Sequence, residues 1–253
     1  ARGMDAQDFD FVIVGGGSAG ATLAARLSED PACRVCLLEA GGRGDHILIR
    51  APAGAVGMLP GYGRISNWAY HTTPQPGLNG RRGYQPRGRA LGGSSAINAM
   101  LYIRGHRADY DHWAALGCTG WSWDECLPWF CKAENNANGA DAHHGADGPL
   151  HVSDQKSPRP ISRAFVQAAT ECGHPERLDF NTGEHEGAGL YQVTQFHDAA
   201  RNGERCSAAA GYLLPVMRGR SNLRVITGAH ATGIVMEGRR ATGVAYRHKG
   251  ADR

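Results

Sequence analysis

Residues 10–39 read DFVIVGGGSAGATLAARLSEDPACRVCLLE, and this stretch decides the fold. An apolar run leads into a glycine turn at 15–20, a run of small residues follows, and a second apolar run ends at Glu39. This order predicts a strand, a helix and a parallel second strand, which form the first unit of a dinucleotide-binding α/β fold. The bounds that we expect for strand, helix and strand are 8–14, 19–29 and 34–39.

Each glycine of the turn has a physical role in this interpretation. Gly15 turns the chain tightly out of the strand, Gly17 lets a pyrophosphate approach the backbone, and Gly20 lets the helix lie close to the sheet. The free N–H groups at the start of the helix then face the phosphates. Glu39 ends the second strand, about 20 residues after Gly20, where an acidic group accepts hydrogen bonds from ribose hydroxyls and disfavours a 2′-phosphate.

Two other interpretations of the turn remain open. It could be a glycine-rich turn that binds nothing. It also fits the nucleophile elbow of α/β-hydrolases, with glycines at 16 and 20 and Ser18 as the nucleophile. The elbow needs strands ahead of it, and the sequence contains no HGGG-type oxyanion segment, so the dinucleotide interpretation is favoured.

The composition describes an ordinary soluble globular protein. The chain has 253 residues, 42% of them hydrophobic and 20% charged, which is enough for one large domain or two small ones. A net charge of +3 without a basic run gives no indication of nucleic-acid binding. There is no apolar run of membrane-spanning length and no signal peptide before the first strand. Seven scattered cysteines form no disulfide framework. We expect a cytoplasmic location, with peripheral binding at the inner face of the membrane as the alternative.

Two residue pairs raise the question of metal or redox chemistry. Cys33 and Cys36 straddle the start of a predicted strand, where residues three apart point to opposite faces, so we interpret both as packing residues. His143 and His144 are adjacent in a polar loop without further ligand spacing, and we expect them to be solvated. The sequence therefore predicts no metal site.

A second glycine turn lies at Gly92-Gly93, within residues 86–105, which read PRGRALGGSSAINAMLYIRG. It predicts a second small-residue helix, capped by Ser94 or Ser95. The small side chains from 92 to 99 allow a flat ring to lie against the backbone. Two such turns imply a ligand with a diphosphate end and an extended, hydrogen-bonding head.

The remaining segments give weaker indications. Residues 41–88 are rich in Gly and Pro and predict a long loop of the kind that wraps a ligand, anchored by burial of Trp68 and Tyr70. Residues 107–134 predict helical pieces, with Trp113, Trp121, Trp123 and Trp129 in the core. We further expect helices at 160–172 and 206–213, and strands at 189–196, 223–226, 231–236 and 241–246.

Residues 88–98 read GRALGGSSAIN, and with Tyr102, Gly105 and Asp111 downstream they resemble the first signature of the glucose-methanol-choline (GMC) oxidoreductases. Shorter stretches that are similar to this family are GGGSAG at 15–20, LLEAG at 37–41, NWAY at 67–70, PQP at 74–76, HGADGPL at 144–150 and NGERCS at 202–207. The resemblance spans nearly the whole chain and is nearest to the bacterial FAD-linked alcohol and choline dehydrogenases.

The resemblance implies an α/β fold, a Rossmann-like FAD-binding domain with part of an α+β substrate-binding domain. The first part of the FAD-binding domain, with its FAD-covering loop and helical insert, is expected at 1–155. Part of the substrate-binding domain is expected at 156–222, and return strands of the FAD-binding domain at 223–253. The family's second signature and its carboxy-terminal His–His or His–Asn pair have no match. We therefore expect an amino-terminal part whose partner is the missing carboxy-terminal half, and name no catalytic residue.

The resemblance also implies FAD rather than NAD as the cofactor. It places the pyrophosphate at the first glycine turn, the adenosine ribose at Glu39 and the adenine at the backbone of Ala231. Some relatives tether the flavin through a histidine in the first signature. No histidine lies between Arg87 and Gly105, so non-covalent FAD is expected. The residues that we expect to bind the cofactor are Gly15, Gly17, Ser18, Ala19, Gly20, Glu39, Ala40, Arg89, Leu91, Gly92, Gly93, Ser94, Asn98, Ala99, Met100, Leu101 and Ala231.

The activity implied is oxidation of a primary alcohol, aliphatic or choline-like, to the aldehyde. A base removes the hydroxyl proton, hydride passes to flavin N5, and the electrons pass to an acceptor other than NAD, such as a quinone, a dye or oxygen. The chain alone is expected to be inactive. Two alternatives stay open, namely a non-catalytic flavin- or nucleotide-binding fragment and an NAD-dependent dehydrogenase. The second leaves the turn at 92–95 unexplained.

Overall fold

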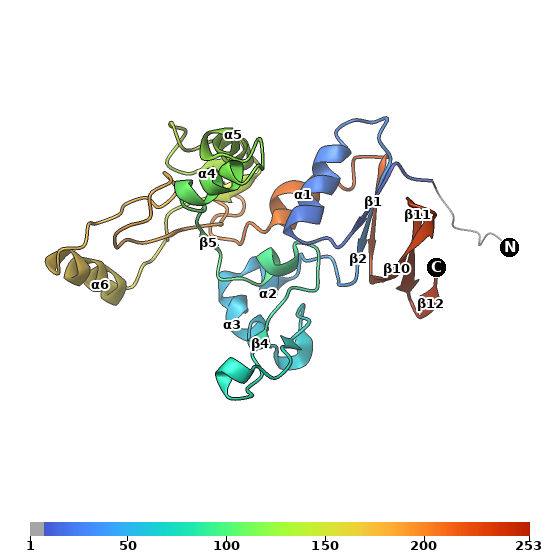
Figure 1. Ribbon diagram of the computed structural model, residues 1–253, viewed down its shortest axis with the longest axis horizontal. Coiled ribbons are helices and arrows are strands. Elements are labelled where there is room, and N and C mark those ends of the chain that lie inside the picture. The colour runs from blue at the N-terminus through green and yellow to red at the C-terminus, as the bar shows by residue number, and fades with distance from the viewer. Residues whose placement is uncertain (1–7) are drawn as a thin grey trace. The chain divides into compact units, whose positions relative to one another are not determined.

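The chain forms two compact units in a computed structural model that describes residues 8–253 (Figure 1). The first unit comprises the chain up to Ala99 together with Ser207–Arg253, and the second comprises Met100–Cys206. The first seven residues of the domain expected at 1–155 lie outside the described residues. The expected division at 155/156 and 222/223 stays a prediction, because compactness does not test what a segment binds.

The predicted strand–helix–strand unit is present in the first unit. It consists of β1 (Phe11–Val14), α1 (Ser18–Leu27) and β2 (Val35–Glu39), and β1 and β2 are parallel. A third parallel strand, β9 (Leu223–Thr227), pairs with the other edge of β2. β2 therefore lies in the middle of the sheet, and all five of its residues are buried.

The core of the first unit follows from the small residues of α1. Ala21 and Ala24 are fully buried and pack with Val35, Leu37 and other apolar residues of the same cluster. Gly20 lies on the same buried face, and a Cβ at this position would overlap the carbonyl oxygen of Gly15. The same Cβ would lie 3.3 Å from Cγ2 of Ile13 in β1, so the helix lies close to the sheet at Gly20, as the sequence predicts.

A hairpin follows β9. Its strands are β10 (Ala229–Glu237) and β11 (Arg240–His248), and a short strand, β12 (Ala251–Asp252), pairs with β11. The strands expected at 231–236 and 241–246 are thus present and longer than predicted. Ala229, at the start of β10, packs with Cys36 and Leu38 of the parallel sheet.

The long segment after β2 contains short elements in a mainly irregular path, as predicted. They are α2 (Ile47–Arg50), 3₁₀ turns at Pro52–Gly54, Tyr62–Arg64 and Pro76–Leu78, α3 (Ala55–Met58), and the antiparallel strands β3 (Tyr70–His71) and β4 (Tyr84–Gln85). Asn67 fixes this path. Its buried amide donates to the Met58 carbonyl at 2.8 Å and accepts from the N–H groups of Ala69 and Arg87.

The prediction of a helix after the second glycine turn is wrong. The chain forms one 3₁₀ turn, Gly93–Ala96, entered through positive φ angles of 94° at Gly92 and 52° at Gly93. Neither serine caps a helix. The Ser94 hydroxyl accepts from the N–H of Gly88, and the Ser95 hydroxyl donates to the Gly92 carbonyl and accepts from the N–H of residue 208. These bonds hold the turn in place of a helix.

The second unit contains three helices, α4 (Arg107–Ala115), α5 (Trp123–Ala133) and α6 (Pro160–Glu171). Its strands are β5 (Leu101–Tyr102) with β8 (Gln192–Val193), antiparallel, and β6 (Glu134–Asn136) with β7 (Leu150–Val152), parallel. The strand predicted at 189–196 is thus reduced to two residues. The predicted tryptophan core is wrong except at Trp123, because Trp113, Trp121 and Trp129 are exposed. In place of the helix expected at 206–213, the first unit contains a short π-helix, Ala209–Leu213.

The packing at Gly20 predicts a stability difference between two helical glycines. Gly20→Ala should lower the free energy of unfolding by about 1–3 kcal/mol, because the new methyl group overlaps the Gly15 carbonyl. Gly57 lies in α3, and among the described residues nothing lies within 4 Å of a Cβ added there. Gly57→Ala should therefore raise the free energy of unfolding by up to about 1 kcal/mol. Urea unfolding of both variants measures this, and equal midpoints would contradict the packing argument.

Candidate functional site

A cavity of about 500 Å³ opens in the first unit at the carboxyl ends of β1 and β2. Ligand pockets in proteins commonly have volumes of about 300–1,000 Å³. Eight of the residues predicted to bind a cofactor line it, namely Gly15, Gly17, Ser18, Glu39, Ala40, Gly93, Ser94 and Ala231. The structure therefore brings the two glycine turns and β10 together around one space.

The two glycine turns contact each other directly. The N–H of Gly92 donates to the carbonyl of Gly16 at 2.7 Å. A Cβ on Gly93 would lie only 2.6 Å from the Cα of Gly17. Two motifs separated by some seventy residues of sequence thus form one continuous backbone surface on the cavity.

Gly17 differs from the other glycines of the first turn. Gly15 has a φ of 92°, which favours glycine, and Gly20 is required by packing. Gly17 has an extended backbone, with φ −71° and ψ −163°, that any residue adopts. Within residues 8–253, the one atom within 4 Å of an added Cβ there is the Cα of Gly93, at 3.9 Å. Neither conformation nor packing explains this glycine, whereas a ligand against its backbone does.

The start of α1 is open to an anion. The residue before the helix is Gly17, which has no side chain to cap the first N–H groups, and the first turn from Ser18 to Ala21 contains no acidic residue. Within residues 8–253, no side chain caps these N–H groups, so the positive end of the helix dipole is available to a ligand in the cavity. This arrangement suits a diphosphate.

Glu39 is buried at the end of β2, with 6% of its surface exposed. One carboxylate oxygen accepts the N–H of Gly16 at 2.8 Å and the other accepts the N–H of Gly41 at 2.7 Å. The side chain thus fastens the first glycine turn to β2, a role that the sequence interpretation missed. Each oxygen keeps a second lone pair, so its expected bond to a ribose hydroxyl stays a prediction.

Aromatic side chains that were predicted to be buried form another side of the cavity. Trp68 and Tyr70 both line the cavity, and their rings stack at a centroid distance of 5.6 Å and an angle of 8°. Tyr70 is 50% exposed, so the prediction that burial of this residue anchors the loop is wrong. The ring of His230 meets Trp68 edge-on, and the Arg89 guanidinium lies 4.5 Å above the Trp68 ring. A flat ligand group could stack here.

The remaining predicted residues do not line this cavity. Gly92 and Leu91 lie behind the turns, and a Cβ on Gly16 would lie 2.6 Å from Leu91 Cδ2. Met100 and Leu101 belong to the second unit, Met100 buried and Leu101 exposed. The others outside the lining are Ala19, Gly20, Arg89, Asn98 and Ala99. Their contacts with a cofactor stay predictions. Lining residues that the sequence interpretation did not select are Val14, Leu38, Trp68, Tyr70, Arg87, Gly88, Ala229 and His230.

These features fit the ADP half of an adenine dinucleotide. The glycine surface and the uncapped start of α1 suit a diphosphate, Glu39 brings a carboxylate to the cavity, and the aromatic side offers a flat face. The N-W-x-Y pattern at 67–70 was the available sequence signal for that face, since it places two aromatic residues in a loop.

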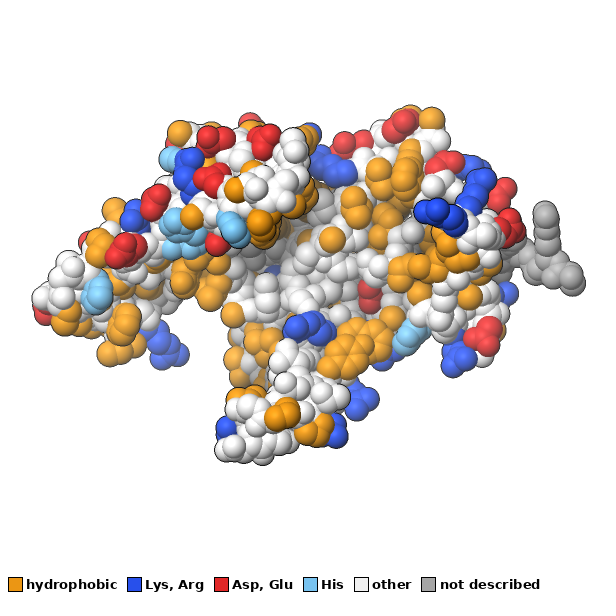
Figure 2. Space-filling view, in the orientation of Figure 1, with side chains coloured by type: hydrophobic (Ala, Val, Ile, Leu, Met, Phe, Trp, Pro, Cys, Tyr) orange, Lys and Arg blue, Asp and Glu red, His pale blue; other side chains and the backbone are white. Residues whose placement is uncertain are grey.

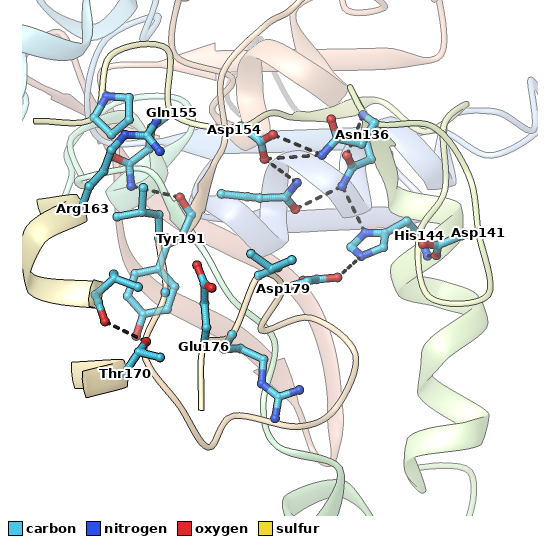
Figure 3. Close-up of a pocket in the computed structure, with 18 of the residues that line it drawn as sticks. Asn136, Asp141, His144, Asp154, Gln155, Arg163, Thr170, Glu176, Asp179 and Tyr191 are labelled. Carbon is cyan, nitrogen blue, oxygen red and sulfur yellow. Dashed lines mark hydrogen bonds and ion pairs between the residues drawn. The ribbon is translucent and has the colours of Figure 1, made fainter. Parts of the chain in front are cut away.

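The second unit has its own cavity, about 680 Å³ in volume and lined mainly by polar side chains (Figure 3). His144 lies at its edge and is only 7% exposed, so the prediction that this residue is solvated is wrong. Its Nε2 lies 2.7 Å from Asp179, and its Nδ1 lies 3.0 Å from Glu134. Glu134 in turn pairs with Arg104 at 2.7 Å, and both of these side chains are buried. Among the described residues, no group of three or more His, Cys, Asp and Glu side chains could hold a metal ion.

The two carboxylates set the charge of His144. The hydrogen bond with Asp179, followed by that with Glu134, raises the pKa of His144 to about 9 against the opposing effect of burial. Burial raises the pKa of Asp179, but the hydrogen bond from His144 and that from the Asn181 N–H outweigh it, and the net pKa is lowered. His144 is thus an imidazolium at neutral pH and completes an alternating row of charges with Arg104, Glu134 and Asp179.

The comparisons with known proteins identify the family. The GMC oxidoreductase family model matches residues 9–253, so the chain belongs to the GMC oxidoreductases. It is 48% identical to an alcohol dehydrogenase (acceptor) of Pseudomonas putida, over 95% of this chain and 42% of that protein. It is 45% identical to the mitochondrial choline dehydrogenase of Mus musculus, over 96% of this chain and 41% of that protein. The predicted family is confirmed.

A solved structure confirms the fold class. An FAD-dependent oxidoreductase from Chaetomium thermophilum superposes with a TM-score of 0.86 at 31% identity, over 97% of this chain and 43% of that one. The chain thus has the α/β FAD-binding fold of its family and spans less than half the length of these three relatives. No helix within residues 8–253 has both the length and the hydropathy needed to cross a membrane.

The bonds of Glu39 predict a loss of stability when the carboxylate is removed. Glu39→Ala should lower the free energy of unfolding by about 2–3 kcal/mol in the absence of any ligand, since two backbone N–H groups lose their acceptor. Glu39→Gln should lower the free energy of unfolding by less, because its amide oxygen still accepts one of the two hydrogen bonds. Asp10→Ala, which removes an exposed carboxylate beside the same sheet, is the control and should cost less than Glu39→Ala. Equal losses for Glu39→Ala and Asp10→Ala in urea unfolding would refute the fastening role.

The raised pKa of His144 predicts a pH dependence. Its ordinary value is 6.5 and its folded value about 9, so the charged form stabilises the fold fully below pH 6.5. That contribution is lost as pH rises through about 9, by about 2–3 kcal/mol in all. His144→Gln should remove this decline. The free energies of unfolding of wild type and His144→Gln, measured between pH about 7 and 10, test this prediction. Parallel pH dependences of the two proteins would refute the role of His144.

Proposed function

We propose that the chain is the FAD-binding part of an oxidoreductase that converts a primary alcohol, aliphatic or choline-like, to its aldehyde. The observation that carries this proposal is Gly17, a glycine without a conformational or packing reason, on the backbone surface that the two turns share. A dinucleotide's diphosphate accounts for it. Family membership supports FAD as that dinucleotide, and two relatives are named alcohol and choline dehydrogenases.

The residues of the first unit would hold the ADP half of FAD. Gly15, Gly17 and Ser18 would bind the diphosphate through backbone N–H groups at the start of α1. Glu39 would accept from the ribose, and the backbone of Ala231 would meet the adenine. When bound, the flavin supplies the acceptor for the hydride that leaves the alcohol carbon. The base that removes the hydroxyl proton is not assigned to any residue of this chain.

FAD is proposed to bind without a covalent bond, because no histidine lies between Arg87 and Gly105. The absorbance spectrum of the purified chain with added FAD tests binding, and acid precipitation tests the mode of attachment. Free flavin in the supernatant is expected, whereas flavin retained in the pellet would contradict the proposal. For the whole protein, oxygen uptake and dye reduction with choline and with aliphatic alcohols distinguish the acceptor and the substrate. A cytoplasmic location is part of the proposal, with peripheral binding at the inner face of the membrane as the alternative.

Substitution of Gly17 separates ligand binding from folding. Gly17→Ala should weaken FAD binding at least about tenfold, and Gly17→Val more, because the added carbons occupy the place of the diphosphate. The unfolding midpoint of the ligand-free Gly17→Ala chain should stay close to wild type, since its backbone and packing accept a methyl group.

Gly42→Ala is the matched control. Among the described residues nothing lies within 4 Å of a Cβ at Gly42, and it does not line the cavity. Its FAD affinity should equal that of wild type, as measured by titration of flavin fluorescence. If Gly17→Ala bound FAD with wild-type affinity, the diphosphate could not lie against this turn. The central support for the proposal would then be lost.

A further inference from the structure

One buried residue of the second unit has a backbone conformation that its side chain disfavours. Met100 has a φ of 64°, in the left-handed region that glycine adopts readily and other residues adopt at an energetic cost. Among residues 8–253, six non-glycine residues have a positive φ, and Met100 is the only one of them that is buried. Such a conformation persists only when surrounding contacts hold it.

Thr194 holds the carbonyl group of Met100. Its backbone N–H donates to the Met100 oxygen at 2.8 Å, and its hydroxyl donates to the same oxygen at 3.3 Å. The carbonyl of Thr194 in turn accepts the N–H of Cys206 at 2.9 Å. The side chain of Met100 is held as well, because the amide of Gln195 donates to its sulfur at 3.9 Å. Three stretches of chain thus fix one strained turn.

The segment that leads into this turn is partly open. Ala96 and Ile97 pack with Ile49 of α2, whereas Asn98 is half-buried and Ala99 is exposed. In Figure 2, the surface between α1 and α2 of the first unit shows mainly backbone and uncharged polar groups. A surface of this kind suits a ligand that bonds to peptide groups.

The strained turn lies within residues 98–101, which the family resemblance predicts to bind the cofactor. None of these four residues lines the cavity that fits the ADP half of a dinucleotide. If FAD places its ADP half in that cavity, residues 98–101 are left for the remainder of the cofactor, which is the flavin ring and its ribityl chain. The conformation of Met100 therefore bears on the flavin end of the site.

We propose that Thr194 is a positioning residue for the flavin end of FAD. It holds Met100 in the left-handed conformation and so sets the direction of the peptide groups on both sides of this residue. Without these bonds, Met100 would be free to relax to a negative φ, and both peptide groups would turn away from the direction that the flavin requires. This inference rests on the proposed function, because it takes FAD as the ligand.

FAD and ADP distinguish the two ends of the site. ADP would contact the first glycine turn without reaching residues 98–101, whereas FAD would contact both. Substitutions at Thr194 and Met100 should therefore weaken the binding of FAD and leave the binding of ADP unchanged. Gly17→Ala should weaken the binding of both ligands. Undiminished binding of both by Gly17→Ala would contradict the proposed function, and undiminished FAD binding by the Thr194 and Met100 variants would contradict this inference.

Two pairs of variants test the hydroxyl and the backbone conformation. Thr194→Val removes the hydroxyl at nearly constant size and should weaken FAD binding about threefold to tenfold. Thr194→Ser keeps the hydroxyl and should restore the affinity. Met100→Ile places a β-branched side chain at a φ of 64° and should weaken FAD binding at least about tenfold. Met100→Leu, which lacks the branch at Cβ, should bind FAD nearly as wild type does.

Titration calorimetry measures the affinities for FAD and ADP, and the visible absorbance of bound FAD reports the surroundings of the flavin. Thr194→Val and Met100→Ile should change this spectrum, and Thr194→Ser should not. The matched control is Thr170→Val, which removes another hydroxyl of the second unit that donates to a carbonyl, that of Val166 at 3.0 Å. Its affinities and spectrum should equal those of wild type.

Two results would overturn the inference. The first is wild-type FAD affinity and a wild-type flavin spectrum in both Thr194→Val and Met100→Ile. The second is a loss of ADP affinity in these variants as large as the loss of FAD affinity, because such a loss would show general damage to the fold and no particular effect on the flavin.

Discussion

The candidate site depends on the buried carboxylate of Glu39. Its oxygens accept from Gly16 and Gly41, and the Gly16 carbonyl accepts in turn from Gly92. This series of bonds runs from the central strand through the first glycine turn into the second. These hydrogen bonds therefore fix the backbone surface that a dinucleotide would meet before any ligand binds. Because the bonds are buried, water cannot replace them.

Glycine serves three different purposes in the first turn. Gly15 is needed for its positive φ, Gly20 for the contact of helix and turn, and Gly17 for neither. Structural demands explain the first two, so only the third carries information about function. The distinction matters because glycine-rich turns are common in proteins. Here the geometry and the independent match to the GMC oxidoreductases point to the same ligand.

Local patterns determined the part of the fold that the sequence could predict. The strands and helix of residues 10–39 follow from apolar runs, small residues and glycines, all of which act within a few positions. The second turn could not be predicted in this way, because Ser95 bonds to residue 208. Likewise, Tyr70 faces a cavity that β10 helps to close, and His144 is buried by Asp179. Contacts over such distances leave no periodic pattern in the sequence.

The row of charges in the second unit makes its segments interdependent. Arg104 binds Glu134, the carbonyl of His143 and the carbonyl of Asn181, so one side chain joins three stretches of chain. If any stretch opened alone, it would leave an uncompensated charge in a buried place. Partial opening is therefore costly, and these stretches should exchange their amide hydrogens as one cooperative unit. The rim of the polar cavity is thus held by electrostatics, and local fraying there is suppressed.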